Sequence, residues 1–436
     1  MNVKTLNSKT AILGMGKSGQ AVAKFLQHIG QEVICFDDHR QEGDVYRYVN
    51  EKALEDVGEV IISPGCSLKH ALVMHAKEKE IPVIGEMSFA LKAISPFIKK
   101  IAVTGTNGKT TVVLLMQHIL QTAGVTVKLG GNIGVPLISL ASDLQEDDIL
   151  IIELSSYQLE TLSGPVFDTG VILNITPDHL DRHETLDRYA EIKCHLQACL
   201  KKEGKLWAYC DVIREWEEKL KVGYFTYGGV KDAFAWTSEN KLHFQQGNSL
   251  DLSSLTQPLS THDKENILAV WMVCKDLGID DALFLKGLQT FQKPSHRIEW
   301  VTSVQGVDYF NDSKGTNLDA TIKAVHSMQK DVILIAGGVH KGASYHQWKE
   351  PFEGRVKCII ALGEASRLIQ EELASHFPVY GVDSLEEAVE RAHLLAERGH
   401  AVLLSPGCAS FDMFKDYVHR GNTFKRLVFE LKNRTE

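Results

Sequence analysis

Short apolar runs alternate with stretches of helical period along most of the chain. An apolar run at residues 11–13 leads through a glycine-rich turn into residues 20–28, where apolar side chains recur at helical spacing. Val33–Phe36 then has the pattern of a second strand. Because parallel strands need a crossover connection, usually a helix, this alternation predicts an α/β fold whose parallel sheets are covered on both faces.

The same pattern divides the chain into three parts. We predict further strands at residues 60–62, 101–103, 149–154, 170–174, 307–310, 332–336, 358–362 and 401–404. We predict further helices at residues 112–123, 186–200 and 262–276, and a less regular, partly antiparallel stretch at 206–244. A chain of 436 residues suggests about three domains. We expect these domains at residues 1–92, 93–295 and 296–436.

Composition narrows the class of protein. Hydrophobic residues make up 44% of the chain and charged residues 24%, which is typical of a soluble globular protein. The formal net charge of -9 argues against a general nucleic-acid binder. The eight cysteines include no CxxC pair, so neither a disulfide framework nor a structural zinc site is indicated. No apolar run approaches the ~20 residues that span a bilayer, and the N-terminus reaches a glycine turn too early for a signal peptide. We therefore expect a cytoplasmic protein without membrane insertion.

Gly14, Gly16 and Gly19 have the spacing of a dinucleotide-binding turn between a predicted strand and a predicted helix. Asp37 ends the next strand, about 20 residues further on. Glycines allow the tight turn, and the helix N–H groups then face a phosphate. Two alternatives stay open: a turn that only packs helix on strand, and an NAD(P)-dependent oxidoreductase.

A second glycine loop, Gly-Thr-Asn-Gly-Lys-Thr at residues 105–110, also joins a strand to a helix. Successive backbone N–H groups in such a loop can wrap a phosphate. Lys109 would neutralise the β- and γ-phosphates of ATP, and the Thr110 hydroxyl would bind Mg²⁺. Val103 stands where a standard P-loop has its first glycine, so we expect a shortened loop with Gly105 at the turn.

Further polar residues follow other predicted strands. Glu153 ends one strand, and His179 follows the next. Each alone is compatible with an ordinary solvated or structural residue, but the carboxyl ends of parallel strands share one edge of a sheet. Arg297, Lys314 and Lys341 lie in turns of the last third, where cations suit an anionic ligand. Together these residues favour a Mg²⁺–ATP site and a facing anion site.

Residues 104–111, 153–159, 174–179, 296–297 and 312–314 together resemble the Mur ligases, the ATP-dependent amino-acid ligases of bacterial peptidoglycan synthesis. Residues 311–317, 404–414 and 419–421 are similar to the members that add D-glutamate to UDP-N-acetylmuramoyl-L-alanine. The resemblance covers essentially the whole chain. It implies Rossmann-like N-terminal and C-terminal domains around a central P-loop ATPase-type domain with a mostly parallel sheet.

The resemblance also implies the ligands. These are UDP-N-acetylmuramoyl-L-alanine, D-glutamate, ATP and two Mg²⁺ ions, with no NAD, and we expect a monomer. The positions that match the family's uridine diphosphate site are Lys17, Ser18, Asp37, Ser63 and Gly65. Those that match its ATP site are Gly105, Thr106, Asn107, Gly108, Lys109, Thr110, Thr111, Asn266, Arg297 and Asp312. Those near its muramoyl or amino-acid substrate are Asn132, Lys314, Thr316, Lys341, Ser410 and Tyr417.

The resemblance places metal ligands at Thr110, Glu153, His179 and Lys193, of which Lys193 matches the family's carbamylated lysine. Carbamylation turns a cation into a carboxylate that can bind Mg²⁺. With Lys109, the residues His179 and Lys193 form the expected catalytic set. The expected reaction proceeds through an acyl phosphate, and we expect a hinge near residue 296 that closes the C-terminal domain over ATP.

Three positions depart from the family pattern. Val339 stands where many relatives have an acid, which leaves Lys341 without that partner, and His39 and Asp263 replace a common Arg and Asn. Two alternatives to D-glutamate ligation remain beside the oxidoreductase: another Mur or folylpolyglutamate-type ligase, and a non-catalytic nucleotide-binding regulator.

Overall fold

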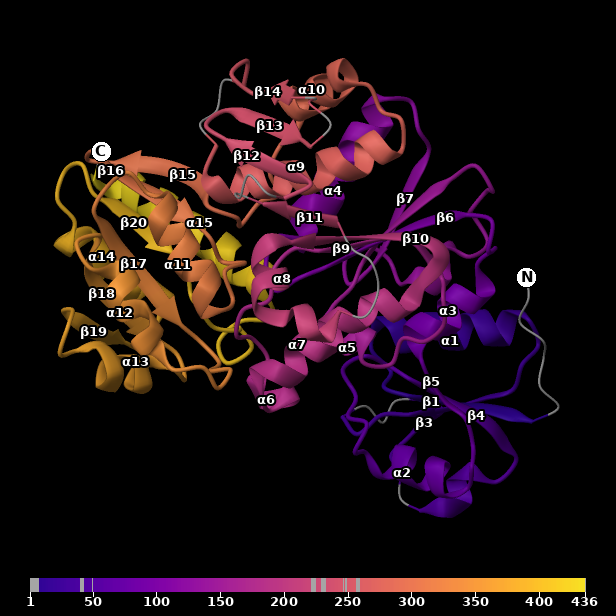
Figure 1. Ribbon diagram of the computed structural model, residues 1–436. Coiled ribbons are helices and arrows are strands. Elements are labelled where there is room, and N and C mark those ends of the chain that lie inside the picture. Colours follow the sequence, from indigo (N-terminus) through magenta and orange to yellow (C-terminus); the bar gives the residue numbers. More distant parts are fainter. Residues whose placement is uncertain are drawn as a thin grey trace. The chain divides into compact units, whose positions relative to one another are not determined.

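Figure 1 shows the chain, in a computed structural model, as β-sheets with helices packed against them. The structure describes residues 8–39, 43–48, 50–220, 225–228, 233–245, 247, 249–255 and 259–435. The expectation of no signal peptide rests partly on residues 1–7, which lie outside these ranges, as do parts of the stretch at 206–244. Among the described residues, no helix is both long and apolar enough to cross a bilayer.

The first sheet is parallel throughout and has the strand order β3-β2-β1-β4-β5. The second halves of its central strands, residues 11–13 and 60–62, are continuously apolar and buried, as expected where helices cover both faces of a parallel sheet. Its elements are β1 (Lys9–Leu13), α1 (Lys17–His28), β2 (Val33–Phe36), β3 (Val45–Tyr46), η1 (Glu51–Leu54), β4 (Val57–Ile62), α2 (Ala71–Glu78), β5 (Val83–Gly85) and α3 (Glu86–Ala93).

The second sheet has the order β14-β13-β12-β11-β10-β9-β6-β8-β7. Its strands are parallel from β7 to β12, and β12, β13 and β14 form an antiparallel end. Its first elements are β6 (Lys99–Thr104), α4 (Lys109–Thr122), β7 (Val127–Gly131), η2 (Leu137–Leu140), β8 (Ile149–Glu153), α5 (Ser156–Leu159), β9 (Phe167–Ile172), α6 (Leu180–His183), α7 (Leu186–Cys194) and η3 (His195–Cys199). Then follow β10 (Leu200–Tyr209), α8 (Cys210–Trp216), η4 (Glu217–Lys219), β11 (Phe225–Gly228), β12 (Ala235–Ser238), β13 (Lys241–Phe244), β14 (Ser249–Asp251), α9 (Thr261–Asp276) and α10 (Asp281–Thr290).

The third sheet, orange to yellow in Figure 1, has the order β15-β16-β20-β17-β18-β19. Only its edge strand β15 runs antiparallel to its neighbour. Its elements are β15 (Glu299–Val304), β16 (Val307–Asn311), α11 (Leu318–Ser327), β17 (Val332–Gly337), η5 (Tyr345–Trp348), α12 (Lys349–Phe352), β18 (Val356–Leu362), α13 (Ser366–Leu373), β19 (Val379–Val382), α14 (Leu385–Leu395), β20 (Ala401–Leu404) and α15 (Tyr417–Thr435). The predicted α/β fold with mostly parallel sheets is thus confirmed.

Contacts between residues divide the chain into two compact units. One comprises residues 1–175 and 190–291 and contains the first two sheets, and the other comprises residues 176–189 and 292–436 and contains the third. Asp178 and His179 therefore belong to the second unit. The domain boundaries after residues 92 and 295 stay predictions.

The predicted helix at 186–200 is too long. α7 ends at Cys194, a 3₁₀ turn follows, and β10 already begins at Leu200, which pairs with Phe167 of β9. Apolar spacing alone does not distinguish a helix end from the start of a buried strand, so the pairing with β9 decides. Likewise β9 ends at Ile172, two residues before the predicted end. The edge strands of the three sheets had no predicted counterpart: β3, β5, β7, β14, β15 and β19.

Candidate active site

The loop between β6 and α4 has the geometry of a phosphate-binding turn. Gly108 caps α4 with φ +87, a left-handed conformation that favours glycine. A Cβ at Gly108 would also lie 2.6 Å from the Asn266 Oδ1 atom of α9. Glycine is therefore required here both by the backbone and by the close approach of α9. The loop places the N–H groups of the first turn of α4 at the carboxyl end of the sheet.

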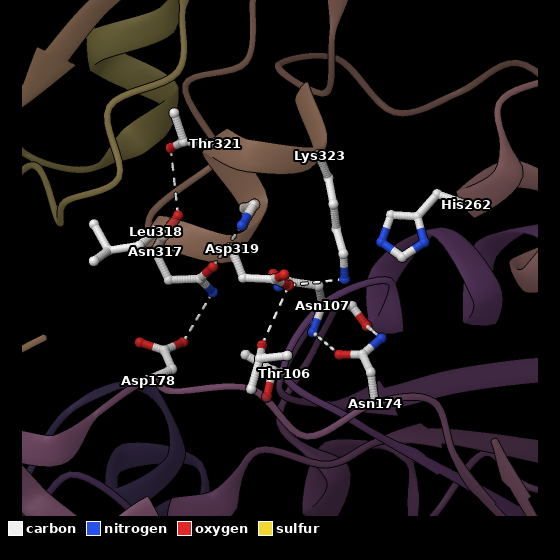
Figure 2. A network of polar contacts seen from close by, with 12 residues as sticks. Thr106, Asn107, Asn174, Asp178, His262, Asn317, Leu318, Asp319, Thr321 and Lys323 are labelled. Carbon is white, nitrogen blue, oxygen red and sulfur yellow. Dashed lines mark hydrogen bonds and ion pairs between the residues drawn. The ribbon is translucent and has the colours of Figure 1, made fainter. Parts of the chain in front are cut away.

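Asn174 holds this loop in place. Its side-chain Oδ1 accepts a hydrogen bond from the Asn107 N–H at 2.8 Å, and its Nδ2 donates to the Asn107 carbonyl at 3.1 Å (Figure 2). The Thr106 N–H also donates to the Asn174 carbonyl at 2.9 Å. The sequence assigned no role to Asn174. Its position as the last residue of the predicted strand at 170–174, and the first of the family-like stretch at 174–179, was the available signal.

Two lysines bring positive charge to one carbonyl of the loop. Lys109 Nζ donates to the Gly105 carbonyl at 2.7 Å and to that of Thr106 at 2.8 Å. Lys193 is 1% exposed, and its Nζ donates to the same Gly105 carbonyl at 2.9 Å. Two ammonium groups that share one neutral carbonyl repel each other, and either an anion bound at the loop or the conversion of Lys193 to an anionic group would relieve that repulsion. Thr110 and Thr111 lie in the first turn of α4 and are partly buried.

Glu153 has a buried carboxylate, one oxygen of which accepts no hydrogen bond. It ends β8 and is 1% exposed. Asn132, which follows β7, donates from Nδ2 to Glu153 Oε1 at 2.7 Å, whereas the buried Oε2 has no hydrogen-bond partner. A buried carboxylate oxygen without a partner is costly, and a bound cation would remove that cost. The residues at this position therefore fit a divalent metal ion.

The start of α9 lies against the phosphate loop through Asn266. Ser260 and Asp263 form a capping box there: the Ser260 Oγ accepts from the Asp263 N–H, and Asp263 accepts from the Ser260 N–H. The departure at Asp263 thus has a structural reason, because a carboxylate at this position caps the helix.

The first glycine turn is stabilised by residues of the neighbouring strands. Asp37, which follows β2, accepts from the Met15 N–H at 2.7 Å. Ser63, which follows β4, donates to the Gly14 carbonyl at 2.7 Å. A Cβ at Gly19 would lie 1.9 Å from that same carbonyl, so only glycine is compatible with this helix–strand packing. The remaining predicted uridine-site residues lie close by in sequence and are partly or fully exposed: Lys17, Ser18 and Gly65.

The second unit places Asp178 at the centre of a polar group. Lys341 Nζ lies 3.2 Å from Asp178 Oδ1, and Asn317 Nδ2 donates to Oδ2 at 3.1 Å (Figure 2). His179, in the left-handed conformation, has its Nε2 3.6 Å from the same carboxylate. Burial alone would raise the pKa of Asp178, but Lys341, His179 and Asn317 together lower it below its ordinary value. Lys341 lacks the acid that many relatives have at position 339, and Asp178 provides a carboxylate partner from another segment.

Asp312 joins three segments of the second unit. The Ser405 hydroxyl donates to its Oδ2 at 2.7 Å, and the Ile298 N–H donates to its Oδ1 at 3.2 Å. Burial raises the pKa of Asp312 to about 7, although Ser405 and Arg297 favour the carboxylate. The candidate ATP residues Arg297 and Asp312 therefore interact electrostatically within this unit.

Two of the predicted substrate residues, Lys314 and Tyr417, meet at the start of α15. The Lys314 ammonium lies 3.9 Å from the centroid of the Tyr417 ring, a cation–π contact. Ser313 Oγ donates to the Tyr417 carbonyl at 2.9 Å. Ser410 is buried and Thr316 partly buried. The structure thus brings together Lys314 and Tyr417, and separately Lys341 with Asp178.

Comparison with known proteins decides the family. The models of the MurD-like N-terminal domain, the Mur ligase middle domain and the Mur ligase glutamate ligase domain match residues 8–85, 103–274 and 296–408. A UDP-N-acetylmuramoylalanine–D-glutamate ligase of Protochlamydia amoebophila is 43% identical over 96% of this chain and 97% of its own length. The chain belongs to the Mur ligase family. A ligase of the same name from Chlamydia caviae is 34% identical over 98% of this chain and 99% of its own.

Solved structures of Mur ligases share the fold. The UDP-N-acetylmuramate–alanine ligase MurC of Thermotoga maritima has a TM-score of 0.60 at 16% identity, with 98% of this chain and 100% of that one covered. MurF of the same organism, in complex with ADP, has a TM-score of 0.60 at 14% identity, with 98% and 96% covered. At these identities the likeness supports the Mur ligase fold, and the family itself uses ATP.

One buried residue of this Mur ligase had no predicted role. Arg420 of α15 is 2% exposed and donates to the Ser313 carbonyl at 2.9 Å and to the Cys408 carbonyl at 3.1 Å. Burial lowers the pKa of Arg420 to about 10. The guanidinium therefore connects the loops that follow β16 and β20. An arginine within the similar segment at 419–421 was the only sequence signal.

Proposed function

We propose that this Mur ligase joins D-glutamate to UDP-N-acetylmuramoyl-L-alanine, with conversion of ATP to ADP and phosphate, during synthesis of the peptidoglycan precursor. The observation that carries the proposal is the identity of 43%, along 96% of the chain, with a ligase named for that reaction. The phosphate loop at Gly105, with the Lys109 ammonium at its carbonyls, supports it independently, because it provides a site for the triphosphate.

The chemistry explains why ATP is needed. A carboxylate is a poor electrophile, because its charge repels an incoming amine and oxide is a poor leaving group. Transfer of the γ-phosphoryl group of ATP to the alanyl carboxylate gives ADP and an acyl phosphate. The amine of D-glutamate then attacks the acyl carbon, the carbon–oxygen bond to phosphate breaks, and one proton leaves the nitrogen. The products are the amide and inorganic phosphate.

The residues around the loop suit the first step. Lys109 would leave the two loop carbonyls to contact the phosphates, and the N–H groups at the start of α4 would bind phosphoryl oxygens. Glu153, through its open Oε2, would hold Mg²⁺, with Asn132 fixing the orientation of its carboxylate. We assign Thr110, His179 and carbamylated Lys193 to the same two Mg²⁺ ions. A bound Mg²⁺ neutralises charge on the phosphates.

The remaining assignments follow the predicted sites. The turn at Gly14, with Asp37 and Ser63, would bind the uridine diphosphate of the precursor. Lys341, Thr316, Ser410 and Lys314 would bind D-glutamate, whose two carboxylates need cations and donors. We keep the prediction of a closure about a hinge near residue 296, and of a monomer in the cytoplasm.

A ligation assay tests the proposal. Purified protein receives ATP, Mg²⁺ and UDP-N-acetylmuramoyl-L-alanine with either D- or L-glutamate, and phosphate and the amide product are measured together. We expect product with D-glutamate only. Precursor labelled with ¹⁸O in the alanyl carboxylate should transfer one label to phosphate. Release of unlabelled phosphate would reject the acyl phosphate, and activity with a folate and glutamate instead would reject the substrate assignment.

A further inference from the structure

One histidine of the first unit takes no part in the reaction steps above. His70 precedes α2 and caps that helix, because its Nδ1 accepts a hydrogen bond from the Leu72 N–H at 3.1 Å. Its Nε2 lies 3.2 Å from Oδ2 of Asp38, in the segment that follows β2. The ring of Tyr48 packs against the imidazole, with 6.2 Å between the two ring centroids. The side chain of His70 is only 17% exposed, so these three neighbours together hold it in place.

The contact with α2 fixes the position of the proton on this histidine. A backbone N–H only donates hydrogen bonds, so Nδ1 must present its lone pair to Leu72. In the neutral ring the proton then lies on Nε2, which donates it to the carboxylate of Asp38. Asparagine, aspartate or serine would cap a helix at least as well as histidine. The cap alone therefore does not account for an imidazole at position 70, whereas the contact with Asp38 does.

This contact joins two segments on either side of the first glycine turn. In the first sheet β1 lies between β2 and β4, and the three strands end level, because Leu13 is paired with both Phe36 and Ile62. Neighbouring strands are about 4.8 Å apart, so β2 and β4 are about 10 Å apart. The contact between Asp38 and His70 thus connects segments whose strands are not neighbours in the sheet. We call it the β2–β4 bridge.

The segment after β2 is held to the glycine turn next to the bridge. Asp37, which directly precedes Asp38, accepts hydrogen bonds from the Met15 N–H at 2.7 Å and from the His39 N–H at 2.9 Å. The backbone on both sides of Asp38 is therefore fixed by the carboxylate of a predicted uridine-site residue.

The segment after β4 is also held by its own turns. The Cys66 N–H donates to the Ser63 carbonyl at 3.0 Å, and the His70 N–H donates to the Ser67 carbonyl at 3.1 Å. These two turns connect His70 to Ser63 and Gly65, which are predicted uridine-site residues as well. A change in the β2–β4 bridge would therefore alter the spacing of both walls of the predicted site.

We propose that His70, by holding Asp38, sets the distance between the two segments that bind the uridine diphosphate. It is then a positioning residue for the uridine substrate. A pocket whose walls already have the spacing of the bound state loses less conformational freedom when the ligand enters, so the ligand binds more tightly. The reacting groups at the Gly105 loop would be unaffected by the bridge. The inference rests on the proposed uridine diphosphate site at the Gly14 turn.

Binding of UDP to the full-length protein tests this role. Isothermal titration gives the Kd of UDP and of ATP for the wild type and for His70→Asn, in which the asparagine keeps the helix cap but is too short to reach Asp38. We expect the Kd of UDP to rise about fivefold, as for one partly buried hydrogen bond to a charged group. The Kd of ATP should stay within about 1.5-fold, because the bridge is not part of the Gly105 loop.

Variants at Asp38 test whether the two residues act through one contact. Asp38→Ala should raise the Kd of UDP by the same factor of about five, and adding His70→Asn should raise it no further. Asp38→Asn keeps an acceptor for the Nε2–H of His70, so its Kd should stay within about twofold of the wild type. Unfolding temperatures identify variants that do not fold.

Lys9→Gln is the matched control. Lys9 Nζ lies 2.9 Å from Glu32 Oε1, and this ion pair is at the start of β1 and β2, at the opposite edge of the same sheet. Its loss removes one partly exposed contact of the first sheet but leaves the β2–β4 bridge intact. The Kd of UDP should therefore stay within about 1.5-fold.

Steady-state kinetics separates positioning from a structural role. In His70→Asn the KM for UDP-N-acetylmuramoyl-L-alanine should rise about fivefold with kcat within about twofold, whereas a loss of folded protein would lower kcat and leave KM unchanged. An unchanged Kd of UDP in His70→Asn would overturn the proposal, as would additive effects in the double variant or an equal effect in Lys9→Gln. UDP binding that depends on His70 in a protein without ligase activity would reject the proposed function and support the bridge.

Discussion

The first unit contains two glycine turns with the same local design and different surroundings. Each joins a buried parallel strand to a helix, the first between β1 and α1 and the second between β6 and α4. In the first turn, the Asp37 carboxylate accepts a hydrogen bond from the Met15 N–H, and the Ser63 hydroxyl donates one to the Gly14 carbonyl. In the second, Asn174 fixes the loop backbone, while Lys109 and Lys193 gather at the Gly105 carbonyl.

The difference shows what a glycine motif leaves undetermined. An acid bonded to a backbone N–H occupies that donor, whereas the partly buried ammonium group of Lys109 brings a positive charge to the second turn. The glycines therefore only make the turn possible. The side chains that neighbouring strands place against the turn decide which ligand it accepts.

The largest effect is expected from removing the cation of the second turn. Lys109→Ala should lower kcat at least about 10³-fold, because developing charge on the transferred phosphoryl group loses a direct partner. Lys17→Ala, the matched change at the start of α1, should leave kcat within about threefold and raise KM for the uridine substrate. Steady-state kinetics with both substrates varied would measure this. Equal losses of kcat in the two variants would contradict the proposal that only the second turn binds the reacting phosphate.

A smaller effect is expected from adding one methyl group to a glycine. Gly108→Ala forces an alanine to φ +87 and against Asn266, and should lower the free energy of unfolding by roughly 1–2 kcal/mol and weaken ATP binding. Gly16→Ala meets no atom within 4 Å and has an ordinary backbone, so its stability should change by less than about 0.5 kcal/mol. Chemical denaturation compares the two. A stable Gly108→Ala variant would show that the loop is not constrained as described.

Loosening the second loop should have a moderate effect on binding. Asn174→Ala removes both side-chain hydrogen bonds to Asn107 and should raise KM for ATP about tenfold, because each bond contributes about 1 kcal/mol to loop order. Asn174→Asp keeps the acceptor for the Asn107 N–H. The loss of ATP-binding free energy in this variant should therefore be about half of that in Asn174→Ala. Unchanged KM values in both variants would argue that the loop holds its shape without Asn174.

The smallest effect on ligation is expected at a buried carboxyl group that follows the first sheet, where the change is one of stability. Glu86 follows β5, and neither of its carboxyl oxygens has a hydrogen-bond partner. Burial raises the pKa of Glu86 to about 7, so its ionisation lowers stability as the pH rises from about 4.5 through 7. Glu86→Gln should therefore stabilise the protein by roughly 1–3 kcal/mol at pH 8 and change little at pH 4.5. If the free energy of unfolding of Glu86→Gln exceeded that of the wild type by the same amount at both pH values, this expectation would be contradicted.

Local patterns predicted much of the fold and the centre of the site. The alternation of apolar runs and helical stretches predicted the main parallel strands, because period and glycine placement depend on neighbours in the chain. The same locality identified the turn at Gly105 and the position of Lys109. It failed at residues 195–200 and at the edge strands, where pairing with a distant strand decides the structure.

The sequence by itself determined that this protein has α/β units, a glycine loop that presents N–H groups to a phosphate, and a lysine at its end. Only the tertiary structure decided that Lys193 meets the Gly105 carbonyl, that Asn132 leaves one oxygen of Glu153 open, and that Asp178 pairs with Lys341. A residue's type and nearest neighbours set which bonds it can make. Which bonds it does make depends on strand order and burial. Both are set by contacts between residues that lie far apart in the chain.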